Sequence, residues 1–250
     1  MPRQLRTTTL AVLLVSLGWV TSAAAAGPPF ELSVKRDRLF GGSTGTLAFT
    51  VEGIEYQTKN TDDARRWPYD EVKQLQILSP TRIAVLTYED RGRLRLGADR
   101  TFDFTVVQSA VSSELVTFLL ERVSRPVVTA VMPQYGGEPL YRVRVKHQRQ
   151  GRGSDGTLVM YERQLLYVTE QDDDSRFWRF GDIYSVQRLD RYRLQVTVYE
   201  GGSGDTRAFV FELKADLSER FFDELWARVN PPALELGRPV TTNLAATGRE

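Results

Sequence analysis

The sequence contains no cysteine and only one histidine, His147. The absence of cysteine excludes disulfide bonds, cysteine ligands for a metal and a lipid-modified N-terminal cysteine. Zinc sites use several histidine or cysteine ligands, so a zinc site of the usual kind is excluded as well. A catalytic triad with a histidine base could form only around His147. We expect this residue to be an exposed loop histidine, and we expect neither a metal nor a cofactor.

Long hydrophobic runs are also missing, except for one at the N-terminus. There, Arg3 and Arg6 precede an apolar run from Leu10 to Val20, and Ala24–Ala26 close the segment. This order is typical of a secretory signal peptide. An uncleaved anchor is the alternative, but a spanning helix needs about 20 apolar residues and this run is shorter. Residues 1–26 are therefore predicted to be a signal peptide, and the mature protein to be exported, periplasmic or extracellular, without a transmembrane span.

Neither sign of charge is in excess. The formal net charge is +1, and loss of Arg3 and Arg6 with the signal peptide changes it to −1. Proteins that bind nucleic acid carry a basic footprint, so nucleic acid is not an expected partner. Hydrophobic residues make up 41% of the chain, which suffices for packed cores. A mature chain of about 220 residues fits two small domains.

An internal repeat decides the domain organisation. Shifting the sequence by 111 residues aligns Pro28–Glu89 with Pro139–Glu200 without a gap, and 21 of the 62 aligned positions are identical. Average composition would give about one identity in sixteen. Further on, Phe102-x-Phe104-x-Val106 corresponds to Phe209-x-Phe211-x-Leu213. The mature chain is therefore predicted to be two diverged copies of one domain.

Each copy contains strand patterns followed by one helical pattern. Apolar residues alternate with the period of half-buried strands in four segments of the first copy: Leu47-x-Phe49-x-Val51, Ile54-x-Tyr56, Ile83-x-Val85 and Phe102-x-Phe104-x-Val106. Ser112–Val123 then has the apolar spacing of an amphipathic helix, as does the segment around Leu225. Asp216 and Glu219 predict a capping-box start for the second helix.

Three motifs recur in the two copies. They are Gly45-Thr46-Leu47, Gly53-Ile54-x-Tyr56 and Arg65-x-Trp67-x-Tyr69-x-Glu71-Val72, with Gly156-Thr157-Leu158, Tyr167 and Arg176-x-Trp178-x-Phe180-x-Asp182-Ile183 in the second copy. These motifs resemble those of the pleckstrin-homology-like (PH-like) superfamily, in particular its GRAM-type branch. The resemblance implies a mainly β fold of two tandem units. Each unit would be a small, partly open antiparallel barrel or sandwich capped by a C-terminal helix. The resemblance also implies that Trp226 is the helix tryptophan that PH domains bury against their barrel.

The predicted boundaries follow from the repeat. They are a PH-like domain at 27–125, a linker at 126–138, a second PH-like domain at 139–232 and a flexible tail at 233–250. Trp67 and Trp178 occupy alternating strand positions beside other aromatic residues, so we expect them in the cores.

Acidic and glycine-rich stretches offer little catalytic chemistry. Asp172–Asp174 is predicted to be a solvated turn, with weak cation binding as the alternative, because it lacks the spacing of a calcium loop. Gly41–Gly45 and Gly201–Gly204 are not followed by the Gly-Lys-Ser/Thr of a phosphate-binding loop. No spacing singles out an acid–base pair of carboxylates. The protein is therefore not predicted to be an enzyme.

A repeated basic site is the most suggestive feature. Lys35 and Arg38 correspond to Lys146 and Arg149, each at the end of the first strand of its copy. In lipid-binding PH domains this region holds anionic headgroups, so the resemblance implies a headgroup site. The full candidate set is Lys35, Arg36, Arg38, Lys146, Arg149 and Arg152. The chain departs from that pattern in the next strand, Leu47-Ala48-Phe49, which lacks the expected basic pair. Ordinary solvated charge is therefore the favoured interpretation of these residues, and a headgroup site is the alternative.

Three function classes therefore compete. The favoured hypothesis is a non-enzymatic binding or scaffold protein; the resemblance to PH-like domains implies that it holds a protein or peptide partner along the groove between a sheet edge and the terminal helix. The alternative is peripheral binding to anionic membrane lipid through the repeated basic loops. A carboxylate-based hydrolase is the third possibility.

Overall fold

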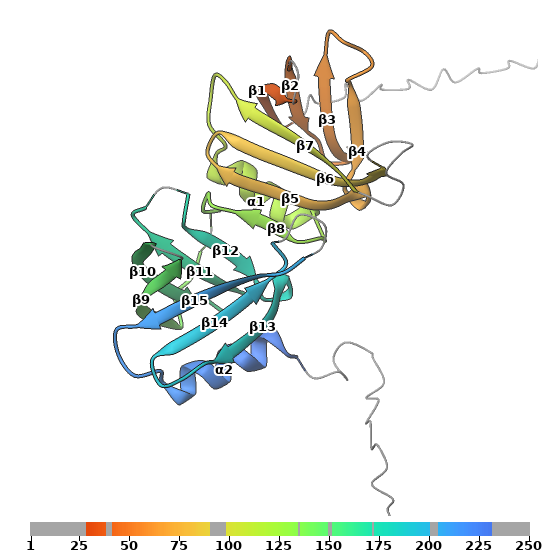
Figure 1. Cartoon of the computed structure of the whole chain (residues 1–250). Coiled ribbons are helices and arrows are strands. Elements are labelled where there is room, and N and C mark those ends of the chain that lie inside the picture. Colours follow the sequence, from red (N-terminus) through yellow and green to blue (C-terminus); the bar gives the residue numbers. More distant parts are fainter. Residues whose placement is uncertain are drawn as a thin grey trace, which may run out of the picture.

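The structure is a computed structural model that describes residues 29–38, 42–90, 99–134, 136–149, 152–171, 173–200 and 205–231. The predicted signal peptide and the predicted tail at 233–250 lie outside the described residues. The described chain is mainly β, with two α-helices, and its strands join in one 15-stranded sheet (Figure 1).

The first half of the chain contains seven strands, a 3-10 turn and a helix. They are β1 (Phe30–Asp37), β2 (Ser43–Phe49), β3 (Gly53–Thr58), β4 (Arg65–Pro68), η1 (Tyr69–Glu71), β5 (Val72–Ser79), β6 (Arg82–Asp90), β7 (Asp99–Val106) and α1 (Ser113–Arg122). We call these elements the first half.

The second half has the same elements in the same order. They are β9 (Tyr141–Arg149), β10 (Arg152–Met160), β11 (Gln164–Thr169), β12 (Arg176–Arg179), η2 (Phe180–Asp182), β13 (Ile183–Arg188), β14 (Arg193–Val198), β15 (Arg207–Leu213) and α2 (Glu219–Val229). The strand order is β5-β6-β7-β1-β2-β3-β4 in the first half and β13-β14-β15-β9-β10-β11-β12 in the second, so within its own half each strand has the same neighbours as its counterpart.

Strand β8 (Val127–Thr129) joins the two halves. It pairs in parallel with β5, and Thr129 pairs with Phe177 of β12. The segment 126–138, which we predicted to be a linker, therefore contains a strand that belongs to the sheet. β13 lies at one end of the sheet and β4 at the other.

Each half has its own hydrophobic core. One cluster gathers the buried residues of β1–β7, α1 and β8, and the other those of β9–β15 and α2. Trp67 and Trp178 are each 2% exposed, one in each cluster, which confirms that they are core residues. The alternation that we extended to Val51 is wrong there, because β2 ends at Phe49 and Val51 is exposed in the following turn.

A serine caps the N-terminus of both helices. The Ser112 hydroxyl accepts a hydrogen bond from the Leu115 amide, and the Ser218 hydroxyl accepts one from the Phe221 amide, so each helix has a side-chain N-cap. Helix α1 lies where the apolar spacing predicted it. The predicted capping box at Asp216 is wrong, because the cap is Ser218 and the helix begins at Glu219.

Close approach between neighbouring strands explains the repeated Gly-Thr-Leu motif. A Cβ atom on Gly45 would lie 2.1 Å from the carbonyl oxygen of Gln57, and one on Gly156 would lie 2.5 Å from that of Val168. No side chain fits at either position without moving the backbone of the next strand.

Candidate functional site

The free edge of β13 is the candidate binding site. An end strand of a sheet presents unpaired backbone N–H and C=O groups that can pair with another chain. In the described part of the chain, β13 pairs with β14 alone. The other end strand, β4, is only four residues long and finishes at Pro68, which has no N–H to donate.

The first half shows what this edge can hold. Its counterpart of β13 is β5, and β8 lies along β5 with Val127 opposite Leu75. The Leu75 amide donates to the Pro126 carbonyl at 3.4 Å, and the Ala130 amide donates to the Ile77 carbonyl at 2.9 Å. The same edge of the sheet thus pairs with β8 in the first half, whereas in the second half helix α2 lies beside β13 (Figure 1).

The register identifies the backbone groups that face out of β13. Leu75 lies opposite Val85 in β6, and Val186 lies opposite Val196 in β14, each 111 residues further on. Both edge strands also have a register shift at the same place, near their first residue. The counterparts of the Leu75 amide and the Ile77 carbonyl are therefore the Val186 amide and the Arg188 carbonyl.

Helix α2 lines one side of this edge. It lies directly against β13 and η2, whereas α1 does not approach β5 as closely. Val186 and Leu225 are buried in the core of the second half, and Val229 packs against that core. Aromatic side chains lie outside it, since Tyr184 on β13 and Trp226 on α2 are 58% and 51% exposed. The prediction that Trp226 is buried is wrong, because Phe221 and Leu225 fill the core beneath the helix.

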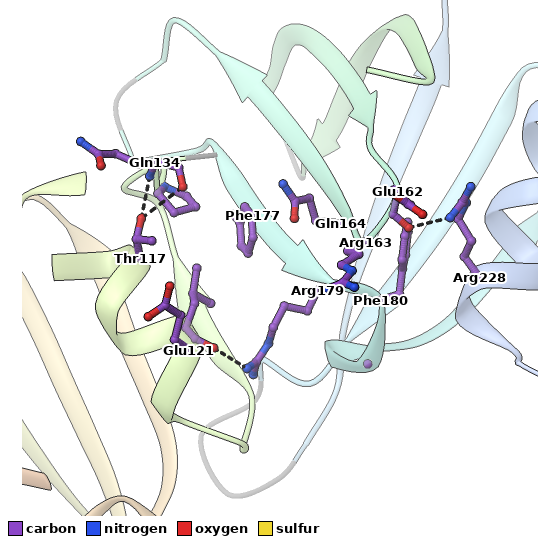
Figure 2. A pocket seen from close by; sticks show the side chains of 13 residues that line it. Thr117, Glu121, Gln134, Glu162, Arg163, Gln164, Phe177, Arg179, Phe180 and Arg228 are labelled. Atoms are coloured by element: carbon purple, nitrogen blue, oxygen red, sulfur yellow. Dashed lines mark hydrogen bonds between the residues drawn. The ribbon is translucent and has the colours of Figure 1, made fainter. Parts of the chain in front are cut away.

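A cleft between the two halves is the other concave feature of interest. It has a volume of about 630 Å³ and lies between α1, the segment around Gln134, and β11–β12 (Figure 2). Figure 2 shows Phe177 and Gln164 pointing into the space and Arg179 reaching towards α1. Beside it, outward-facing apolar residues of the second half pack against Leu120 and Met132.

Arg179 connects the two halves through hydrogen bonds. Its guanidinium donates to the carbonyl oxygens of Val123 and Arg125, both at 2.7 Å, beyond the last turn of α1. It also holds the carboxylate of Asp182 at 2.8 Å. Burial raises the pKa of Asp182, and the contact with Arg179 opposes that rise. Arg179 therefore serves the joint between the halves and is not free to bind an anion.

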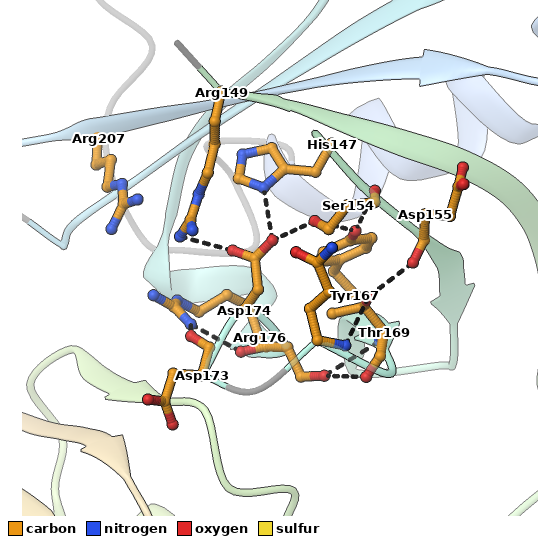
Figure 3. A network of polar contacts seen from close by, with 12 residues as sticks. His147, Arg149, Ser154, Asp155, Tyr167, Thr169, Asp173, Asp174, Arg176 and Arg207 are labelled. Carbon is orange, nitrogen blue, oxygen red and sulfur yellow. Dashed lines mark hydrogen bonds and ion pairs between the residues drawn. The ribbon is translucent and has the colours of Figure 1, made fainter. Parts of the chain in front are cut away.

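A buried polar network lies inside the second half (Figure 3). His147 Nδ1 lies 3.3 Å from Asp174 Oδ2, and the Ser154 hydroxyl donates to the same oxygen. Arg149 reaches the other carboxylate oxygen at 2.6 Å. The prediction of an exposed His147 is wrong, because the ring is 2% exposed and packs between Tyr167, Phe209 and Phe211.

Asp174 is also not the solvated turn residue that we predicted. It is buried, whereas Asp173 is exposed in the left-handed backbone region and Asp172 lies outside the described residues. Burial alone would raise the pKa of Asp174. The hydrogen bonds from His147 and Ser154 and the charge of Arg149 outweigh burial and lower that pKa to about 2. Asp174 is therefore an ionised anchor of the network.

This network does not have the geometry of a catalytic triad. In a triad the histidine bonds the nucleophile and the carboxylate orients the histidine. Here Ser154 and His147 both bond Asp174, and all three side chains are buried away from any substrate. In the described residues, no three histidine or acidic side chains gather into a group that could hold a metal ion. None of the described helices is long and apolar enough to cross a membrane.

The first half contains a related network, in which arginine replaces the histidine and Ser43 contacts Tyr56. Asp63 accepts from Arg38 and lies 3.4 Å from Arg36, and Tyr56 bonds Ser43 at 2.9 Å. Arg36 occupies the place of His147 and is buried over the ring of Phe102. A guanidinium in one half thus corresponds to an imidazole in the other.

The structure divides the predicted basic residues between two faces of the sheet. Arg36 points into the core, and Arg38 and Arg149 bind the buried carboxylates of Asp63 and Asp174. Lys35 and Lys146 lie exposed on the opposite, outer face. Arg152 begins β10 opposite Arg149. The six residues therefore form no single cluster.

Sequence reasoning missed two cations that lie next to Lys146. Arg142 and Arg144 are exposed on the outer face of β9, so three cations follow one another at every second residue. Side chains two residues apart on a strand share a face, so this pattern could have been read from the sequence. The counterparts in the first half are Glu31, Ser33 and Lys35, which do not form such a row.

The sequence matches no known family profile and no curated protein. Two solved structures are similar to parts of it. One is described as the C-terminal domain of an unknown protein from Leishmania infantum, at 10% identity over 37% of this chain and 84% of that chain, with a TM-score of 0.29. The other is the Spt16D Pob3N heterodimer, at 8% identity over 68% of this chain and 82% of that chain, with a TM-score of 0.27. Likenesses at these TM-scores assign neither a fold family nor a function.

Proposed function

We propose that this chain is an exported, non-enzymatic binding protein of two PH-like domains, and that it binds an extended segment of a protein partner along β13. One observation carries the proposal. The edge of β5 is occupied by β8, whereas no described residue pairs with the same edge of β13. The chain itself thus provides an example of the complex that β13 would form.

Two further features support the PH-like assignment and export. Each half consists of seven strands in the same order, followed by one helix, which is the arrangement that the repeated motifs imply. Basic residues, an apolar run and Ala24–Ala26 at the N-terminus have the order of a cleaved signal peptide.

Strand addition suits this edge physically. The Val186 amide and the Arg188 carbonyl would bond the backbone of the incoming segment, and side chains along the edge would provide specificity. Because β8 fills the edge of β5, the first half would serve as a scaffold and the second half as the binding unit. The joint made by β8 and Arg179 would hold the two in one orientation.

Selection of displayed peptides tests the proposal. Random peptides would be selected on residues 27–250 and then measured against Val186→Pro, which removes the outward amide. We expect the selected peptides to lose at least tenfold in affinity. Amide hydrogen exchange would be followed in the unsubstituted protein, where bound peptides should slow exchange in β13.

Two outcomes would contradict this function. Peptides that bind Val186→Pro equally well and leave exchange in β13 unchanged use another surface. A failure to select any peptide would remove the support for peptide binding altogether. Thermal melts show whether Val186→Pro is folded, and if it is not, the exchange data alone decide. Removal of residues 232–250 in a parallel sample shows whether that segment competes for the edge.

Binding to anionic lipid is the second candidate, and the row of Arg142, Arg144 and Lys146 favours it. Cations exposed along one strand can contact several headgroups at once. Flotation with anionic liposomes at low and physiological salt, with the three residues changed to Glu, tests this candidate. Salt-sensitive binding that the variant loses would support a lipid site on β9. Absence of flotation would contradict lipid binding.

A further inference from the structure

We infer that the segment bound at β13 runs parallel to this strand and places a valine-sized aliphatic side chain opposite Val186. The inference rests on the proposed function and specifies its ligand. It follows from the way in which β8 lies on β5, and from the residues that correspond to that contact in the second half.

The orientation comes from the register of β8. Leu75, Gln76 and Ile77 lie opposite Val127, Val128 and Thr129 in ascending order, so the two strands are parallel. A parallel pair uses evenly spaced, slanted hydrogen bonds, and its donors and acceptors on the edge strand are fixed by register. Since β13 has the register of β5 against its inner neighbour, it offers the same groups in the same direction.

The side-chain preference comes from Val127. This residue is buried in the core of the first half, in one cluster with Leu75 of β5 and with Leu119 and Val123 of the helix segment. The counterparts of those three residues are Val186, Leu225 and Val229, all of which belong to or pack against the core of the second half. No described strand pairs with β13 on this side, and helix α2 covers Val186 there.

The surroundings also exclude other side chains at this place. Val186 and Leu225 are apolar, so a charged side chain between them would be buried without a partner. The residue before it contributes only a carbonyl in the first half, where it is Pro126. The expected ligand is therefore a segment that tolerates proline and continues with valine, isoleucine or leucine.

Helix α2 must move to admit this side chain. It lies directly on β13, whereas α1, beside the filled edge of β5, stands further away. A side chain inserted between β13 and α2 would shift the helix towards the position that α1 holds. Trp226 is half exposed on α2, so its fluorescence reports the movement.

The chain supplies its own probe for the test. A synthetic peptide with the sequence of residues 124–132, Ser-Arg-Pro-Val-Val-Thr-Ala-Val-Met, would be titrated onto residues 27–250. The control peptide carries Asp in place of the residue that corresponds to Val127. We expect slowed amide exchange in β13, a change in Trp226 emission that Trp226→Phe abolishes, and at least tenfold weaker binding of the control.

Orientation is measured with a spin label on the peptide. A label at its N-terminus should broaden signals near Ile183, and a label at its C-terminus should broaden signals near Arg188. The reverse assignment, or equal affinity of the two peptides, would overturn the inference. Selected peptides that protect β13 while this probe does not bind would leave the proposed function intact and refute the inference alone. If no peptide of either kind protects β13, both fail.

Discussion

The two halves of the chain share one element order but use their outer faces in opposite ways. In the second half an apolar patch on β10–β12 packs beneath α1 and Met132; it consists of Val159, Tyr161, Leu166 and Phe177. The equivalent residues of the first half are Ala48, Thr50, Glu55 and Arg66. There Arg66 forms an ion pair with Glu55 at 3.1 Å, and the face carries charge instead of a partner.

The edge strands β5 and β13 also differ between the two halves. The first half has β8 on the edge of β5 and a polar outer face, whereas in the second half no described strand other than β14 pairs with β13 and the outer face is covered. Only 21 of the 62 aligned positions are identical, and the exchanged residues change which surfaces each copy buries. Repeated sequence therefore does not imply repeated packing within a chain.

The largest effect is expected from removing the buried tryptophan that both halves have. Trp178→Ala removes a fully buried indole from the core of the second half and should lower the free energy of unfolding by about 3–5 kcal/mol. Trp67→Ala should cost a similar amount in the first half and would also leave the Glu89 carboxylate without its 2.8 Å bond from the indole. Chemical denaturation measures both changes.

Trp226→Ala is the matched control for this prediction. Its side chain is half exposed, so the free energy of unfolding should change by no more than about 0.5 kcal/mol. A loss similar to that of Trp178→Ala would mean that Trp226 packs against something in solution. Trp178→Ala with unchanged stability would mean that the core does not depend on the indole.

The next largest effect is expected from removing the contact between Arg179 of the second half and the end of α1. Arg179→Ala removes charged hydrogen bonds to the end of α1 and leaves buried Asp182 without its partner. We expect a loss of about 2–3 kcal/mol, in the range of charged hydrogen bonds. Pro68 is the equivalent residue of the first half and makes no such joint, so Pro68→Ala is the control. Equal losses in the two variants would show that the guanidinium contributes nothing particular to the joint.

The smallest effect sharpens the comparison of the two polar networks. Because the pKa of Asp174 is lowered to about 2, its ionised form stabilises the fold above the pKa of about 4 that an unfolded chain has. This contribution, about 2 kcal/mol, should be lost as the pH falls from about 4 to about 2. In Asp174→Asn this acid-dependent part should be missing.

Urea unfolding at several pH values checks this prediction. A pH dependence between 4 and 2 that is the same in Asp174→Asn and the unsubstituted protein would contradict it. His147→Arg gives the second half the cation that the first half has at Arg36, and tests whether the two networks tolerate the same side chain at this place.

The sequence predicted much of the secondary structure because local pattern determines it. Alternation and the apolar spacing of Ser112–Val123 located strands and α1, and neighbouring aromatic residues identified Trp67 and Trp178 as core. His147 could have been placed by the same rule, since it follows Val145 by two residues and so shares its inward face. The prediction that it is exposed followed from its place at the end of a strand, next to a loop.

The candidate site could not be predicted in this way. Strand β8 is three residues long, and it forms only because β5, some 50 residues earlier, offers an edge. The exposure of Trp226 likewise depends on what covers α2, since its helical position is the one that Leu120 holds beneath the second half. Which edge stays open is a property of pairings between distant segments, and a linear pattern does not contain it.

Strand β8 also determines where the chain can be divided. A cut after residue 125, at the predicted boundary, would take Val127 from the core of the first half and its hydrogen-bonding neighbour from β5. A cut after residue 132 would instead remove Met132 and α1 from the apolar face of the second half. Neither half can be excised with all its contacts, so either half on its own would expose apolar residues that the whole chain buries.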